Sequence, residues 1–369
     1  MVEFNEKTYP YIPSIPIPPG ETILELLEER GIKQTELAER MGRPPKVINE
    51  IIKGKSAITA DTAIQLEQVL GIPAKFWNNL EANFREILAR SKAEEQYKDE
   101  VKTAVQYPYE EMARWDWVPK AKDRLEKTKH LLNYFGVTSL HHTIESKKAE
   151  AVLYRISKKK NYSIPAVTAW LRKGAIDAQS IEVKPFDSKK LKELTADIRS
   201  MTTEKPDSFH PRLVEKLSDA GIAFTVTPNL KNAPISGASR WLSPSKALIQ
   251  LSIRYRYNDI FWFSLFHELA HVLYHSKKEI NIDMSNLARE DEDERLADDF
   301  AANTLIPEKE YGEFVGRRSF DYSAVRSFAK TMGVHPGIVV GRLQHDYHIA
   351  PNSLNGLRDR FCWKDSKQE

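Results

Sequence analysis

The chain has 369 residues, of which 41% are hydrophobic and 10% aromatic, so it is long and apolar enough to form two or three globular domains. Its 55 basic and 52 acidic residues leave a formal net charge of +3, so any basic surface for nucleic acid has to be local. The single cysteine, Cys362, excludes an intrachain disulfide framework and a cysteine-rich metal site, and it suits a cytoplasmic protein.

Five segments differ in their residue patterns. Residues 1–20 are rich in proline and are expected to form an extended lead-in, not a signal peptide. Residues 21–90 alternate short amphipathic runs with turns at Gly and Pro, which predicts a bundle of five helices. Residues 91–205 are predicted to be a helical connector, residues 206–350 a second domain with strands, and residues 351–369 a C-terminal tail.

The strand signals of the second domain are GIAFTVTP and KALIQLS, which are apolar and rich in β-branched residues. SGASRWLSPSK lies between them and is expected to form a turn-rich loop. The most apolar run, IFWFSLFHELAHVLYH, is too short and too polar to span a bilayer, so no membrane partner is expected. The predicted fold class is α+β, predominantly helical, with a small sheet.

The second and third helical runs have the layout of a DNA-binding helix-turn-helix. KQTELAERMG, a tight turn at Gly42 and PPKVINEIIKGK follow one another directly. Between Arg40 and Ser56 there are five basic residues and one acidic residue. Basic charge is therefore concentrated on the predicted recognition helix, where DNA phosphates would lie. The alternative is a helical bundle whose lysines are merely solvated.

The start of the recognition helix is expected to face the DNA groove. Pro45, Lys46 and Asn49 lie there, and the amide of Asn49 has the donor and acceptor that read an adenine edge. Gln34 and Lys55 are expected to hold phosphates. Lys53 completes the predicted DNA-binding set. The expected partner is double-stranded operator DNA with a palindromic site, bound by a homodimer.

The stretch from PGETILELLEERGIKQTELAERMG through INEIIKGKSAITADTAIQLEQVLGIPAKFWNNLEA resembles the Xre-type, lambda-repressor-like domain of HigA-family antitoxins. The resemblance implies an antitoxin or autorepressor that binds DNA, with a cognate toxin as a partner. That family usually has Ser or Thr before the recognition helix, whereas Pro44 and Pro45 stand here. Proline suits the first helical position, but Pro44 cannot supply a side-chain cap.

A second motif has the spacing of a zinc site. Residues 267–271 read H-E-L-A-H within a strongly helical, apolar run. Two histidines four residues apart lie on one face of a helix, so the imidazoles of His267 and His271 can bind one Zn²⁺. Glu268 then projects beside the metal, where it can act as the catalytic base. The alternative is a buried structural helix, which would bury these polar groups at a cost in free energy.

A third zinc ligand is expected from the acidic run REDEDERLADDFAANTLIP. Glu294, Ala297 and Ala301 fall on one helical face, and the two alanines allow another helix to approach closely. Asp298 follows Glu294 by one turn, so it is placed to hydrogen-bond a zinc-binding histidine from outside the ligand set. The alternative for the five acids 290–294 is a solvated helix N-terminus.

FHELAHVLYH followed by E-x-x-A-x-x-F-A-A-x-x-L-I-P resembles the ImmA/IrrE family of zinc metallopeptidases. SGASRWLSPSKALIQLSIRYRYNDIFWF, VTAWLRKGAIDAQ and HPGIVVGRLQHDY are similar to longer members that also carry an Xre-type domain. The resemblance implies a zincin-like metallopeptidase domain, with His267, His271 and Glu294 as zinc ligands and Glu268 as general base. Some relatives cleave a helix-turn-helix repressor, and others are regulators without demonstrated proteolysis.

Two functions follow from these patterns. The first is a DNA-binding transcriptional regulator whose zinc metallopeptidase domain hydrolyses a peptide bond in a regulatory protein or in itself. The second is a HigA-like antitoxin or autorepressor whose metallopeptidase-like domain senses or binds a partner without proteolysis. Peptide hydrolysis also needs an oxyanion donor, and the sequence does not choose among five candidates: Arg240, Tyr255, Tyr257, His335 and His345.

Overall fold

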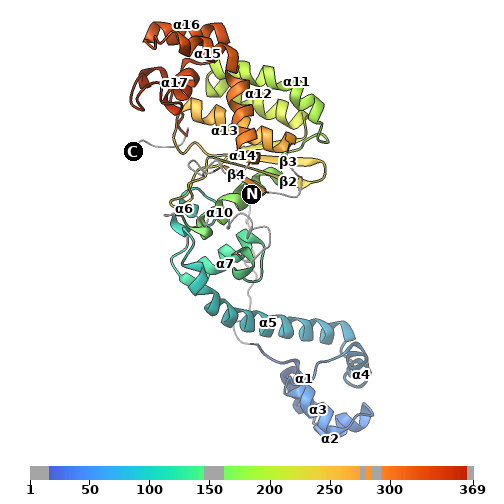
Figure 1. The fold of residues 1–369 in the computed structure, drawn as a ribbon. Helices are drawn as coiled ribbons and strands as arrows, with labels where there is room; N and C mark the ends of the chain where they lie inside the picture. The colour runs from blue at the N-terminus through green and yellow to red at the C-terminus, as the bar shows by residue number, and fades with distance from the viewer. Residues whose placement is uncertain (1–15, 145–161, 275–279, 284–291, 364–369) are drawn as a thin grey trace, which may run out of the picture. The chain divides into compact units, whose positions relative to one another are not determined.

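The computed structural model describes residues 16–144, 162–274, 280–283 and 292–363 (Figure 1). Residues 1–15 of the expected lead-in lie outside the described residues, as do residues 364–369 of the expected tail. The chain forms two compact units, residues 1–100 and residues 101–369. Among the described residues, no helix is both long enough and apolar enough to cross a membrane.

The first unit is the predicted helical bundle, and its last helix continues into the second unit. Its five helices are α1 (Pro19–Glu29), α2 (Gln34–Arg40), α3 (Pro45–Ile52), α4 (Ala60–Leu70) and α5 (Ala74–Ala104). Their apolar faces meet in a core in which Ile23, Leu37, Leu66 and Trp77 are each exposed by 1% or less. This burial follows from the 3.6-residue period of the apolar positions in each helix.

Local sequence signals explain where these helices begin and end. α3 begins at Pro45 without a side-chain cap, as the proline pair predicts. α4 begins after Thr59, whose hydroxyl accepts a hydrogen bond from the backbone of Thr62, and it ends at Gly71 with a φ of 67°. α5 contains neither Gly nor Pro along its 31 residues, so the expected boundary at residue 90 falls inside a continuous helix.

The second unit is built on a four-stranded sheet. The strands are β1 (Ile222–Val226), β2 (Gly237–Ser243), β3 (Lys246–Leu251) and β4 (Ile280–Asp283), in the spatial order β1-β3-β2-β4. β1 and β3 are parallel, whereas β2 is antiparallel to both β3 and β4. The fold class is therefore α+β with a small sheet, as predicted.

Helices surround this sheet. Those before it are α6 (Tyr109–Arg114), α7 (Arg124–Phe135), α8 (His141–Ile144), α10 (Ile164–Gln179), α11 (Ser188–Ser200), the short η1 (Met201–Thr203) and α12 (Pro206–Asp219). Those after the first three strands are α13 (Asn258–Tyr274), α14 (Glu292–Leu305), α15 (Glu308–Gly316), α16 (Tyr322–Met332), α17 (Pro336–His345) and the short η2 (Asn355–Leu357).

The prediction of a turn-rich loop in SGASRWLSPSK was wrong. Gly237–Ser243 forms strand β2, which pairs with strands on both of its sides, and the turn is confined to Pro244 and Ser245. Gly237 has no side chain where β2 packs closely against Glu268 of α13, and a local reading of the sequence takes the small residues of β2 for turn formers. β4 was not predicted at all.

Helices α10 and α13 cover opposite faces of the sheet. A Cβ placed on Gly174 of α10 would meet the side chain of Gln250, with 2.0 Å to its Oε1. The next residue of β3, Leu251, lies instead beside Gly237 and Glu268 on the α13 side. Successive side chains of a strand point to opposite faces. The segment expected to be a connector thus supplies one of the layers that bury the sheet.

The segment after α17 packs against the start of α13. Arg358 donates from Nε and Nη2 to the two carboxylate oxygens of Asp259, at 2.9 and 2.8 Å, and both side chains are buried. The amide of Phe361 donates to the carbonyl oxygen of Arg256 at 2.6 Å. The expected tail is therefore part of the folded unit as far as residue 363.

Candidate metal centre and helix-turn-helix surface

The histidine motif lies in the most deeply buried helix of the second unit. Nearly every position of α13 from Asn258 to Val272 is buried, because the sheet covers one side of the helix and α14 another. His267, Glu268 and His271 are exposed by 3%, 0% and 2%. Three polar side chains in such a place need partners, since burying them unpaired costs several kcal/mol (about 1–3 kcal/mol for each group).

The two histidines and Glu294 of α14 form one compact group. His267 Nε2 lies 2.9 Å from His271 Nε2 and 3.2 Å from Glu294 Oε2, and His271 Nε2 lies 3.7 Å from Glu294 Oε1. The three ligand atoms are all within 4.8 Å of one another. The structure thus brings together the residues predicted as a zinc set, although they come from two helices.

Close packing of the helices explains this approach. Ala297 and Ala301, on the Glu294 face of α14, are both fully buried. Without bulky side chains at these positions, α14 can lie close against α13, and the carboxylate of Glu294 reaches the imidazoles. Two arginines hold the far end of α14: Arg199 donates to the carbonyl oxygen of Leu305 at 3.0 Å, and Arg342 donates to that of Ile306. Neither arginine was predicted from the sequence.

Asp298 lies beside the first histidine. Its Oδ1 is 3.0 Å from Nδ1 of His267, and an ionised carboxylate can only accept a hydrogen bond from that nitrogen. In the neutral ring the lone pair is then on Nε2, the atom that faces Glu294. A lone pair of an imidazole and a carboxylate that face each other need a cation or a proton between them. The donor set of two imidazoles and one carboxylate fits Zn²⁺ with one coordination position left for water or substrate.

Glu268 lies on a different stripe of α13 from the histidines. It faces β2, where Gly237 leaves room for it: a Cβ on Gly237 would stand 2.8 Å from Glu268 Oε1 and 2.9 Å from its Cγ. The carboxylate is therefore held on the same helix as the two histidines, in a place with no access to bulk water.

In the first unit, all six predicted DNA-binding residues are exposed: Gln34, Pro45, Lys46, Asn49, Lys53 and Lys55. The opposite side of α3 is buried through Ile48, Ile51 and Ile52. The polar side of the helix is thus available to a ligand.

Comparison with known proteins finds a family match in each of the two units. Residues 23–77 match the family described as "Helix-turn-helix", and residues 259–344 match the family described as "IrrE N-terminal-like domain". An uncharacterized HTH-type transcriptional regulator of Escherichia coli, YddM, is 35% identical over 63 residues, which are 17% of this chain and 67% of YddM. The chain is a helix-turn-helix protein with an IrrE-like domain.

Other relatives match shares of the chain of similar size. Virulence-associated protein I of Dichelobacter nodosus is 36% identical over 69 residues, which are 18% of this chain and 64% of that protein. The chain thus spans about two thirds of the length of both curated relatives. Among solved structures, a putative antidote protein of a plasmid maintenance system from Nostoc punctiforme is 34% identical, covering 23% of this chain and 92% of its own, with a TM-score of 0.22. The Pseudomonas aeruginosa antitoxin HigA, solved with the higBA promoter, is 31% identical, covering 23% and 95%, also with a TM-score of 0.22.

The five oxyanion candidates of the second unit have other contacts. Arg240 alternates with Ser239 along β2, so it faces α10, where it donates to the carbonyl oxygen of Leu171 at 2.7 Å. Burial lowers the pKa of Arg240 to about 10. His335 caps α17 by accepting from the amide of Gly337 at 3.0 Å.

The three remaining candidates lie on the surface or in side-chain stacks. The guanidinium of Arg358 stacks on the ring of Tyr257, with 3.9 Å between Cζ of Arg358 and the ring centroid. Tyr255 is exposed, and the guanidinium of Arg254 stacks on its ring. Nδ1 of His345 lies 2.9 Å from Oδ1 of Asp346. These contacts give no reason to choose one of the five as the oxyanion donor.

Proposed function

We propose that this protein is a DNA-binding transcriptional regulator, of the antitoxin type, whose IrrE-like domain is a zinc-dependent peptidase. The observation that carries the proposal is the convergence of His267, His271 and Glu294, with the carboxylate of Glu268 buried on the same helix. The substrate class is a peptide segment of a regulatory protein or of this chain itself. A regulator that binds chromosomal DNA would act in the cytoplasm.

Each residue has a distinct task in this reaction. When bound by three protein ligands, zinc makes water acidic near neutral pH and polarises a peptide carbonyl group. His267, His271 and Glu294 would hold the metal, and Asp298 would keep His267 in the tautomer that ligates it. Glu268 takes the proton of the attacking water and returns it to the departing amine nitrogen. Burial of the group excludes bulk water, which strengthens these electrostatic interactions.

The metal is tested first. Zinc bound per chain is measured by mass spectrometry on protein purified without added metal. We expect about one zinc in the parent and far less in Glu294→Ala, because the loss of one of three ligands weakens binding strongly. Glu292→Ala is the matched control, since Glu292 is an exposed carboxylate on the same helix. A parent that takes up no zinc, even after reconstitution at neutral pH, would contradict the proposal.

Proteolysis is tested separately from metal binding. The zinc-loaded protein is incubated alone and with helix-turn-helix repressors encoded nearby, and products are identified by mass spectrometry. We expect cleavage by the parent and none by Glu268→Gln, which keeps its zinc because Glu268 is not a ligand. Cleavage that persists in Glu268→Gln would remove Glu268 from the role of base.

The second candidate is a regulator whose IrrE-like domain binds a partner, such as a cognate toxin, without cleaving it. The observation in its favour is that residues 23–77 match the helix-turn-helix family separately from the IrrE-like match at residues 259–344, so regulation has support independent of the peptidase motif. This candidate predicts operator binding that is unchanged in Glu268→Gln, with no cleavage of any protein tested.

A further inference from the structure

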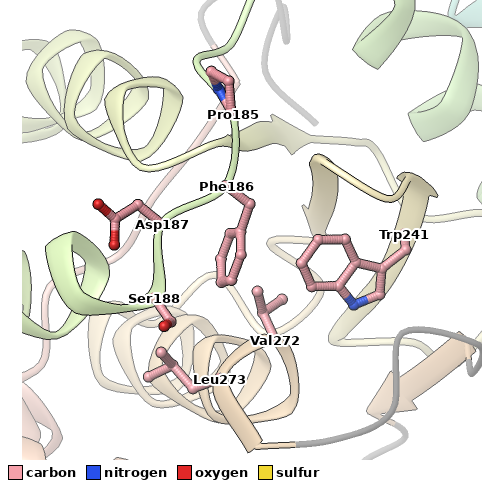
Figure 2. Close-up of a pocket in the computed structure, with 7 residues that line it drawn as sticks. All are labelled: Pro185, Phe186, Asp187, Ser188, Trp241, Val272 and Leu273. Carbon is pink, nitrogen blue, oxygen red and sulfur yellow. The ribbon is translucent and has the colours of Figure 1, made fainter.

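A cavity of about 650 Å³ opens on the surface of the second unit beside the end of α13 (Figure 2). Its apolar walls are Phe186, which precedes α11, Trp241 of β2, and Val272 and Leu273 of α13. The rings of Phe186 and Trp241 meet edge to face, with 4.8 Å between their centroids and 84° between their planes. The volume is that of a pocket for a small ligand or for a large side chain.

The cavity is adjacent to the proposed catalytic group. Val272 and Leu273 directly follow His271 in α13. Val272 also lies four residues after Glu268, so the two side chains share one stripe of the helix, about 6 Å apart along its axis. On the sheet side, Trp241 and Gly237 lie on the same face of β2, and Gly237 contacts Glu268. A peptide bond held at Glu268 would therefore bring a neighbouring side chain to this cavity.

The two aromatic rings and the two aliphatic side chains on the walls favour an apolar occupant. A third aromatic ring could pack against the two rings already present, in the offset or edge-to-face arrangements that aromatic groups prefer. The carboxylate of Asp187 at the rim points away from the two rings (Figure 2) and accepts hydrogen bonds from the amides of Lys189 and Lys190 at 2.9 and 3.1 Å. An anionic occupant would lose hydration here without gaining an opposite charge.

From this geometry we infer that the cavity is a specificity pocket, which takes an aromatic or large aliphatic side chain next to the cleaved bond of a peptide substrate. The inference rests on the proposed peptidase function. It adds the substrate preference, which the histidine motif by itself does not define. Phe186, Trp241 and Val272 are specificity-determining residues in this assignment, because they would contact the substrate without taking part in bond cleavage.

The test uses ten-residue fluorescent peptides of Gly and Ser that differ only in one central residue: Phe, Leu, Ala or Asp. For the zinc-loaded full chain, we expect cleavage next to Phe or Leu with kcat/KM about ten-fold or more above that of the Asp peptide. Binding is measured by fluorescence anisotropy on Glu268→Gln, which does not depend on catalysis. The Phe peptide should bind it more tightly than the Asp peptide by a similar factor.

Two kinds of variant assign the preference to this cavity. Ser188→Trp places a large side chain at the exposed rim, outside the core, and should abolish the difference between the Phe and Asp peptides in both assays. Trp241→Ala should weaken the preference, and Trp241→Phe should restore most of it. Zinc content is measured for each variant as a check on the fold of the domain.

The outcomes separate the pocket from the peptidase. Cleavage without preference, equal binding of the Phe and Asp peptides, or a preference unchanged in Ser188→Trp would overturn the pocket assignment. If no peptide is cleaved but the Phe peptide binds Glu268→Gln with a preference that Ser188→Trp removes, the cavity binds apolar side chains and the peptidase function is what fails.

Discussion

Gly237 and Glu268 are packed so closely that residue 237 has no room for a side chain. A Cβ there would stand 2.8 Å from Glu268 Oε1 and 2.8 Å from Cδ2 of Leu251. Both atoms are the outer ends of side chains, so they can move without displacing the backbone. The glycine is required by this approach and not by its backbone angle, since its φ is not in the left-handed region.

We therefore expect Gly237→Ala to displace the carboxylate of Glu268 and leave the metal ligands in place. Peptide cleavage should fall about ten-fold or more, since a well-placed general base contributes roughly 10²–10⁴-fold. Zinc content should be unchanged. Gly312→Ala is the control, because Gly312 lies in helix α15 with nothing within 4 Å of its added Cβ. Full activity in Gly237→Ala would show that the close packing of Gly237 against Glu268 does not position the base.

The contact of Asp298 with Nδ1 of His267 predicts an effect on metal affinity. Asp298→Asn replaces a carboxylate with an amide, which weakens its interaction with the imidazole and the control of its tautomer. Zinc affinity, measured by competition with a chelator, should fall about 10- to 100-fold. Asp299→Asn, the exposed neighbour on the same helix, should bind zinc as the parent does. Equal affinity for the two variants would count against this role for Asp298.

The exposed residues of α3 predict two different effects on DNA binding. Asn49→Ala should cost about 1–3 kcal/mol at the specific operator and little on unrelated DNA, because Asn49 is proposed to read a base edge. Lys46→Ala should weaken binding to both kinds of DNA and change the slope of log K against log salt. Gln68→Ala, at an exposed position of α4 outside the α2–α3 pair, is the control. Affinities are measured at several salt concentrations by anisotropy.

The environment of His335 predicts how the stability of the second unit depends on pH. Its Nδ1 accepts hydrogen bonds from Asn258 Nδ2 at 2.6 Å and from the amide of Gly337 at 3.0 Å, so the ring is neutral. Burial holds the pKa of His335 below its usual value, although Asp359 and Asp259 act in the opposite direction. The unfolded chain then binds a proton before the folded chain does. Stability should fall as the pH drops below the usual histidine value of about 6.5, until the lower folded pKa is reached.

This dependence is measured by urea unfolding between pH 8 and pH 5, followed by tryptophan fluorescence, since six of the seven tryptophans lie in the second unit. His335→Gln keeps an acceptor but cannot be protonated, so its stability should change less with pH than that of the parent. Burial lowers the pKa of His210 as well, and this contribution is present in both proteins. Parallel curves for the two proteins would assign the pH dependence to other groups.

Patterns that repeat along one helix were enough to predict much of this protein. The four-residue spacing of His267 and His271 places both on one helical face, and the phase of Ala297 and Ala301 singled out Glu294 among neighbouring acids. The helices of the first unit were predicted for the same reason, since each is defined by its own apolar period and by local turn residues. The last of these helices, α5, extends to Ala104 and is longer than predicted. The sequence has no turn residue at the end of the first unit, because one helix continues through that boundary.

Contacts between distant segments could be decided only by the tertiary structure. β2 was expected to be a loop because its small residues have the local preferences of a turn, whereas Gly237 among them is small because Glu268 of α13 packs against it. The packing of Glu268 against Gly237 brings together residues that are far apart in the chain, and so does the cavity beside Trp241. The sequence alone therefore determined which residues share a helical face, because helix geometry is local. Tertiary packing decided which faces meet, because that depends on shape complementarity between distant elements.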